Sequence, residues 1–77
     1  MADDVIKVVD AKGLSCPMPV LLARRAVDEV EAGNVIRIEA TDAGSKSDIP
    51  SWTKDMGYEM LDSEIDGPVY TFTIRKT

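Results

Sequence analysis

Residues 13–20 read Gly13-Leu14-Ser15-Cys16-Pro17-Met18-Pro19-Val20, and they contain the only cysteine of this 77-residue chain. A short run rich in β-branched residues precedes them, and a longer run with helical periodicity follows. Proline is tolerated in the first turn of a helix, because its missing N–H has no intrahelical acceptor there. The stretch therefore predicts a strand-to-helix turn that holds one thiol at the start of a helix.

The length of the chain indicates a single domain spanning residues 1–77, and its apolar content of 44% is that of a globular protein. A net charge of −5 argues against stable direct binding to nucleic acid. One cysteine cannot form an intrachain disulfide, which favours a reducing cytoplasm. The chain shows neither a signal-peptide pattern nor an apolar run of membrane-spanning length, so we expect no membrane association.

The remaining pattern predicts the order βαβαββ. Strands are expected at residues 5–9, 35–41, 58–65 and 69–75, with a hairpin turn at Asp66-Gly67 between the last two. A first helix should end near residue 32, before Gly33, and a second should cover residues 47–56. Two helices cannot cover both faces of a four-stranded sheet, so we expect an α+β fold. This fold is a two-layer α/β sandwich with a mixed sheet and both helices on one face.

Helical periodicity assigns each helix an apolar face. For the first helix this face comprises Val20, Leu22, Ala23, Ala26, Val27 and Val30, and for the second it comprises Ile49, Trp52 and Met56. Met18 and Leu21 fall outside the buried face and next to Cys16, which predicts an apolar docking patch beside the thiol.

Two helix starts remain open. In the first, Cys16 is the N-cap and Pro17 the first helical residue; in the second, the helix starts at Pro19 and Cys16 lies in the approach loop. The cap of the second helix is equally open among Ser45, Ser47 and Asp48, with Pro50 near the first turn.

Cys16 is the candidate reactive residue. A helix N-terminus lowers the pKa of a thiol, because its free N–H groups and the helix dipole stabilise the thiolate. Pro17 and Pro19 have no N–H, so the available donors are the amides of Met18 and Val20. Lys12, Arg24 and Arg25 would add positive potential, and they are also the candidate partner contacts, together with Met18 and Leu21.

The absence of histidine and of a second cysteine narrows the chemistry. It argues against a Cys–His nucleophilic pair and against a dithiol oxidoreductase. What remains is sulfur exchange between proteins, in which the thiolate takes a sulfur atom from a persulfide and later releases it to another thiol. Such a carrier turns over only with partner proteins. We expect no cofactor and no metal site.

The chain resembles the TusA/SirA-like sulfur carrier proteins along nearly its whole length. The resemblance is carried by residues 10–20, the Arg24-Arg25 pair, Thr41-Asp42, Asp48-Ile49-Pro50 and the last strand, residues 70–76. Ala43 departs from the family pattern, since many relatives have proline there. The resemblance implies the sandwich of the C-terminal domain of translation initiation factor 3. It also implies a persulfide on Cys16 that is received from a cysteine desulfurase or rhodanese-like donor. Relatives supply sulfur to tRNA thiolation, molybdenum-cofactor enzymes or sulfur oxidation.

Two other functions stay open from the residues alone. In one, the chain is a non-catalytic regulatory or protein-interaction module with a structural cysteine. In the other, the thiol is a redox sensor that forms a reversible sulfenic or mixed-disulfide state. A sulfur carrier should gain a single sulfur atom on Cys16 from a persulfide donor, and neither of these two alternatives predicts that gain.

Overall fold

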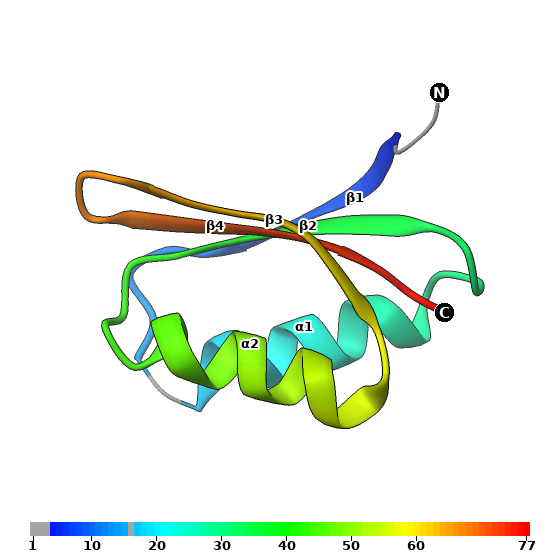
Figure 1. Cartoon of the computed structure of the whole chain (residues 1–77). Helices are drawn as coiled ribbons and strands as arrows, with labels where there is room; N and C mark the ends of the chain where they lie inside the picture. Colours follow the sequence, from blue (N-terminus) through cyan, green and yellow to red (C-terminus); the bar gives the residue numbers. More distant parts are fainter. Residues whose placement is uncertain (1–3, 16) are drawn as a thin grey trace.

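The computed structural model describes residues 4–15 and 17–77. Its elements follow the predicted order: β1 (Val5–Ala11), α1 (Met18–Asp28), β2 (Val35–Ala40), α2 (Ser45–Met56), β3 (Glu59–Asp66) and β4 (Val69–Arg75). The strands form one sheet in the order β1-β2-β4-β3, in which β1 is parallel to β2 and the other two pairs are antiparallel. Both helices lie on the same face of the sheet (Figure 1), which confirms the predicted two-layer sandwich.

The parallel pair determines where the loops and helix starts lie. Ala11 at the end of β1 is paired with Ala40 at the end of β2. The chain therefore leaves both strands at the same end of the sheet. Both helices begin beside that end of the sheet and run back in the same direction under it (Figure 1). The β1–α1 loop, which contains Cys16, is therefore a neighbour of the β2–α2 loop.

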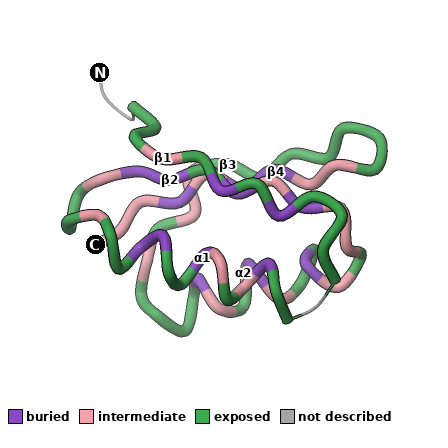
Figure 2. The backbone as a smooth tube through the Cα atoms, turned by 180° about the vertical axis from the view of Figure 1, so that it is seen from behind, coloured by how far each residue is buried: buried purple, intermediate pink, exposed green. Residues whose placement is uncertain are grey.

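The core lies between the sheet and the helices. Its buried members are Val9, Ala23, Ala26, Val27, Ile36, Ile38, Ile49, Phe72 and Ile74. Buried positions alternate with less buried ones at the end of β1 and along most of β2, whereas β3 has no buried residue (Figure 2). Full burial of one such aliphatic side chain contributes about 1.5–3 kcal/mol. No helix among the described residues is long and apolar enough to span a membrane.

Neither predicted start of α1 is observed. The N-cap is Pro17, with φ −97° and ψ 12°, and the helix begins at Met18. A proline disfavours the helical conformation of the residue before it, yet Met18 is helical although Pro19 follows it. Pro19 is fully buried, and this packing favours the helix. The predicted N-cap role of Cys16 is therefore wrong.

The end of α1 also differs from the prediction, since the helix stops at Asp28 and not near residue 32. The Lys76 ammonium group donates to the carbonyl oxygens of Val27 at 2.7 Å and Val30 at 2.9 Å. The final carbonyl groups are thus satisfied by a side chain from the far end of the sequence, which no local signal could reveal. Gly33, at φ 96°, lies in the turn that follows.

α2 begins two residues earlier than expected, and its N-cap is Gly44 without a side-chain cap. Asp42 takes over this role from the loop, because its carboxylate accepts the Gly44 amide at 3.1 Å and its carbonyl accepts the Ser45 amide at 3.0 Å. Pro50 consequently lies in the second turn of the helix and not in the first.

One residue of the predicted apolar face of α2 is wrong. Met56 is 50% exposed, whereas Thr53 is only 2% exposed. The Thr53 hydroxyl donates to the Ile49 carbonyl at 2.7 Å, which removes the cost of burying it. Trp52 stays partly buried against the core, as expected, and its ring makes an edge-to-face contact with that of Tyr58 at an interplanar angle of 76°.

The strands differ from the prediction only at their ends. β1 extends to Ala11 because Asp10 and Ala11 pair with β2, and β3 runs from Glu59 to Asp66. Asp66 pairs with Val69, so the two turn residues are Gly67 and Pro68 in place of Asp66 and Gly67. Gly67 supplies the positive φ of 61° that this turn requires.

Candidate functional site

The predicted site lies where the β1–α1 and β2–α2 loops meet. The Gly13 amide donates a hydrogen bond to the Thr41 hydroxyl at 2.9 Å, and this bond joins the two loops. Gly13 has a φ of 82°, a conformation that glycine adopts without strain. The Leu14 amide donates back to the Ala11 carbonyl at 3.2 Å. The chain that leads to the thiol is therefore anchored to both parallel strands.

Cys16, the predicted carrier, lies outside the described residues, so the site is defined by the residues around it. Ser15 and Pro17 are both exposed. The Ser15 carbonyl accepts the Met18 amide at 3.0 Å, and the Pro17 carbonyl accepts the Leu21 amide at 3.1 Å. The segment on each side of Cys16 is thus held by backbone hydrogen bonds while it remains open to solvent.

Two helix N-termini, and not one, lie beside this loop. α1 begins at Met18 and α2 begins at Ser45, both at the end of the sheet where β1 and β2 end (Figure 1). Each helix start carries a partial positive charge that stabilises a nearby anion. Of the two amide donors predicted for the thiol, that of Met18 donates to the Ser15 carbonyl. At the start of α2, the Ser45 amide donates to the Asp42 carbonyl, so this helix start adds its partial charge and not a free Ser45 donor.

Lys12 does not provide the free positive charge that the sequence suggests. Its ammonium group lies 2.7 Å from the Glu39 carboxylate and 3.3 Å from that of Asp10. The hydrogen bonds to Glu39 and Asp10 raise the pKa of Lys12 above its ordinary value, and the amide and ammonium groups of Lys12 lower the pKa of Asp10. The charge of Lys12 is therefore largely compensated by two carboxylates, one near the end of β1 and one near the end of β2.

The other predicted partner contacts lie on the exposed surface of α1. Met18 is 40% exposed and Leu21 is 46% exposed, whereas Val20 packs against the core. The spacing of Met18, Leu21 and Arg25 places them in one row along the helix, and we call this row the α1 stripe. Among residues 4–15 and 17–77, neither Arg24 nor Arg25 forms an ion pair within 4.0 Å. The arginines are therefore available to a partner.

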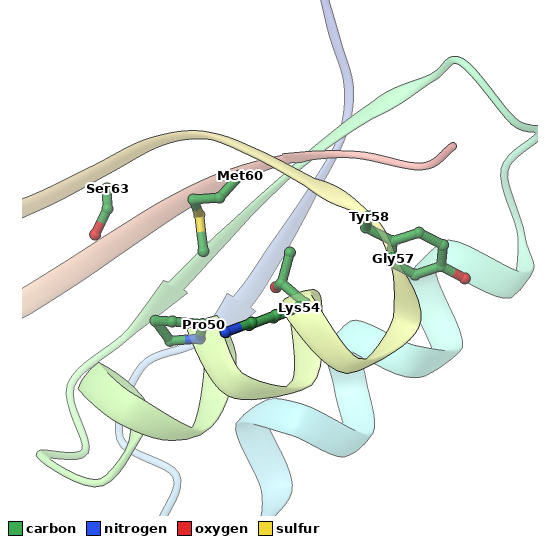
Figure 3. A pocket seen from close by; sticks show the side chains of 7 residues that line it. Pro50, Lys54, Gly57, Tyr58, Met60 and Ser63 are labelled. Atoms are coloured by element: carbon green, nitrogen blue, oxygen red, sulfur yellow. The ribbon is translucent and has the colours of Figure 1, made fainter.

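A cavity of about 440 Å³ lies elsewhere, between α2 and β3. Met60 points from β3 toward α2, and Pro50 and Lys54 form part of the opposite wall (Figure 3). None of the site residues predicted around the thiol lines this cavity. In the part of the chain that the structure describes, no group of three or more metal-ligating side chains is found.

The site contains two features whose roles were not predicted. Thr41 was part of the family resemblance, but its hydrogen bond to the loop before Cys16 joins residues 28 positions apart. The start of α2 was expected to be an ordinary cap. The only local signal for Thr41 and for the start of α2 is that both follow a strand directly. The carboxyl ends of neighbouring parallel strands lie at the same end of a sheet, so residues there can lie close together.

Comparisons with known proteins agree on one family for this chain. Residues 7–76 match the family model described as sulfurtransferase TusA. The putative sulfur carrier protein YrkI of Bacillus subtilis is 41% identical over 91% of this chain and 93% of its own length. The sulfur carrier protein TusA of Allochromatium vinosum is 35% identical over 96% of this chain and 97% of its own. The crystal structure of a SirA-like protein from Desulfitobacterium hafniense superimposes with a TM-score of 0.80. It is 32% identical in sequence, and the match covers 91% of this chain and 96% of that one.

Proposed function

Because this chain belongs to the TusA family of sulfur carrier proteins, we propose that it accepts a sulfur atom as a persulfide on Cys16 and passes it to a partner protein. The observation that carries the proposal is that the only cysteine lies in the loop directly before α1, at the end of the sheet where α2 also begins (Figure 1). We expect a thiolate at a helix start to be stabilised without a histidine base.

The transfer consists of two exchange steps in which sulfur atoms and electrons balance. In the first step, the Cys16 thiolate attacks the outer sulfur of a persulfide on the donor protein. The new S–S bond forms on Cys16, and the donor thiolate leaves. In the second step, the thiolate of the acceptor attacks the outer sulfur carried by Cys16, and the Cys16 thiolate leaves. A stabilised thiolate is the better leaving group, so the helix termini assist the release.

The surface around the loop supports docking of these partners. The exposed side chains of Met18 and Leu21 offer apolar area beside the thiol, while Arg24 and Arg25 can meet carboxylates of a partner. Pro17 and Pro19 hold the start of α1, and the buried Pro19 fixes it to the core. Lys12 supports the loop through its ion pairs with Asp10 and Glu39 and has less to offer a partner.

The family implies a donor and an acceptor protein. For this chain we propose a cysteine desulfurase or a rhodanese-like protein as donor, in the cytoplasm, where a lone thiol stays reduced. The acceptor would belong to tRNA thiolation, to molybdenum-cofactor assembly or to sulfur oxidation. Genes neighbouring the gene for this chain would separate these three pathways.

The test is the intact mass of the protein after incubation with a protein persulfide donor. We expect a gain of one sulfur atom on the wild type, its removal by a thiol reductant, and no gain on Cys16→Ser. An unmodified wild type, or a Cys16→Ser variant that still gains the sulfur, would contradict the proposal. If Cys16→Ala kept both partner binding and cellular function, the chain would be an interaction module with a structural cysteine.

A further inference from the structure

The two outer strands of the sheet, β1 and β3, differ in how they are protected. β3 carries four acidic residues, Glu59, Asp62, Glu64 and Asp66, and such charges discourage pairing with another chain. Both strands have a register shift near one end, between Val5 and Lys7 in β1 and between Met60 and Asp62 in β3. β1 differs in that it exposes Ile6 and Val8, which are 55% and 58% exposed. An outer strand that combines exposed apolar side chains with an unpaired backbone edge is a template for a further strand.

A groove runs along this edge between β1 and α1. Its volume is about 280 Å³. Its lining comprises four consecutive residues of β1 and four residues of α1 and its C-cap: Lys7, Val8, Val9, Asp10, Leu22, Arg25, Ala26 and Glu29. Lys7 and Val9 face the helix, whereas Ile6 and Val8 lie on the opposite face of the strand. Successive side chains of a strand added to β1 would therefore point to opposite faces. One set would lie in the groove, and the other set would lie beside Ile6 and Val8.

The charges of the groove indicate what such a strand should carry. Lys7 is paired with Glu29 at 2.7 Å, and Asp10 is paired with Lys12 at 3.3 Å. Lys7, and to a smaller extent Arg25, lowers the pKa of Glu29. Arg25 is left without an ion pair within 4.0 Å among the described residues. The complementary group is a carboxylate on the groove side of the added strand.

A second copy of this chain fits the edge poorly. In a symmetric antiparallel pair centred on Lys7, Lys7 would face Lys7 of the second copy, and Asp4 would face Asp10. Centring on Val8 would place Ile6 opposite Asp10, and centring on Ile6 would place Val8 opposite Asp4. The register centred on Lys7 also pairs Ile6 with Val8, but it opposes like charges on both sides of that pair. The other two registers set an apolar residue against a carboxylate, so a segment with a different pattern is favoured over these three.

We propose that the β1 edge binds an extended segment of a partner protein, which adds a fifth strand to the sheet. The segment carries apolar residues at alternate positions, over Ile6 and Val8, and a carboxylate on its other face, opposite Arg25. The α1 stripe leads from the groove at Arg25 to Met18 beside the thiol loop. A partner held on β1 is thus positioned to reach Cys16, but the binding itself does not depend on sulfur transfer.

The test uses the Cys16→Ser variant, so that thiol chemistry cannot contribute, and the blocked peptide Thr-Val-Glu-Val-Thr-Val-Lys as probe. Titration to millimolar peptide should shift the backbone amide NMR signals of β1 and of Leu22, Arg25 and Ala26 on α1. Signals of β3 should stay in place. Absence of shifts, or shifts on β3, would overturn the proposal.

Matched variants sharpen the test. Val8→Lys should weaken peptide binding several-fold or more, whereas Ile65→Lys, which changes an equally exposed apolar residue on β3, should leave it unchanged. Arg25→Glu should weaken binding, and replacing the peptide Glu by Lys should restore it. Equal loss in both strand variants, or no rescue by the charge exchange, would contradict the assigned orientation.

Two further readouts separate the alternatives. A dimer that forms without peptide and is lost in Val8→Lys would show that the occupant is a second copy, which overturns the proposal. With Cys16 restored, Val8→Lys should still gain sulfur from a small-molecule persulfide. If the protein does not bind the peptide but gains sulfur normally, the proposed binding at the β1 edge is rejected and the carrier function stands. If it binds the peptide but gains no sulfur, the carrier function is rejected and binding at the β1 edge stands.

Discussion

The Gly13 amide donates to the Thr41 hydroxyl at 2.9 Å, so the loop that leads to Cys16 is bonded to the end of the neighbouring strand. The bond closes a gap of 28 residues in sequence with a single side chain. It depends on the parallel register that places Ala11 beside Ala40. The position of the thiol loop therefore depends on the second strand as much as on the first.

Replacing Thr41 by valine removes this acceptor while keeping the shape of the side chain. We expect a loss of about 1 kcal/mol in the free energy of unfolding, because the Gly13 amide loses its partner. The alkylation rate of Cys16 should change as well. Urea denaturation and iodoacetamide kinetics measure the two effects. Thr73→Val, on β4, is the control, and an equal change in alkylation rate there would contradict a specific role of Thr41.

Gly13→Ala tests the positive φ of 82°. No atom lies within 4 Å of an added Cβ, so the cost is conformational, roughly 1–2 kcal/mol. Gly57→Ala, with φ 78° at the end of α2 and equally open surroundings, should cost about as much. Only Gly13→Ala should also slow sulfur loading. If both variants slow loading equally, the loss follows from general instability and not from the loop.

Leu21→Glu tests the apolar patch beside the thiol. The side chain is 46% exposed, so we expect little change in stability but a loss of roughly tenfold in the rate of sulfur transfer from a cysteine desulfurase. Met56→Glu, at 50% exposure on α2, is the matched control and should transfer at the wild-type rate. The prediction is rejected if loading from a small-molecule persulfide falls by the same factor, because that donor needs no docking.

Lys76→Met tests the side chain that ends α1. The ammonium group bonds the carbonyl groups of Val27 and Val30, so its loss should cost about 1–3 kcal/mol of unfolding free energy. Lys54→Met, which changes an exposed lysine of α2, should cost far less. Thermal or urea unfolding measures both. Equal stability of the two variants would mean that the contact contributes nothing beyond its charge.

The ion pairs of Lys12 predict a pH dependence at both extremes. The pKa of Asp10 is lowered, so its contribution to stability is present above its ordinary value of 3.8 and is lost as the pH falls through the lower folded value. The pKa of Lys12 is raised, so its contribution is present below 10.5 and is lost as the pH rises through the higher folded value. Lys12→Gln should flatten the alkaline limb of a plot of melting temperature against pH. It should reduce the acidic limb only in part, because the backbone amide of residue 12 still donates to Asp10. High salt should shrink the difference, since both groups are exposed, and a profile parallel to the wild type would contradict the assignment.

Local patterns predicted most of the fold. β4 was predicted with its observed bounds, and the other strands within two residues, because alternation in a half-buried strand is a local signal. The helix ends were less predictable. The end of α1 depends on Lys76 and the start of α2 on Asp42, and neither residue lies in the helix that it terminates. The apolar patch of Met18 and Leu21 was predictable, because both residues break the periodicity of the buried face.

The sequence by itself determined the order of elements and the two-layer architecture, and it nominated Cys16 as the candidate reactive residue. Each of these follows from residue type and spacing alone. Only the tertiary structure decided that a second helix start lies beside the thiol loop and that Thr41 bonds Gly13. It also decided that Lys12 is compensated by Asp10 and Glu39 and that β1 presents an open edge above a groove. The physical reason is that strand order and register bring together groups that are far apart in the chain, and their charges and hydrogen bonds depend on that proximity.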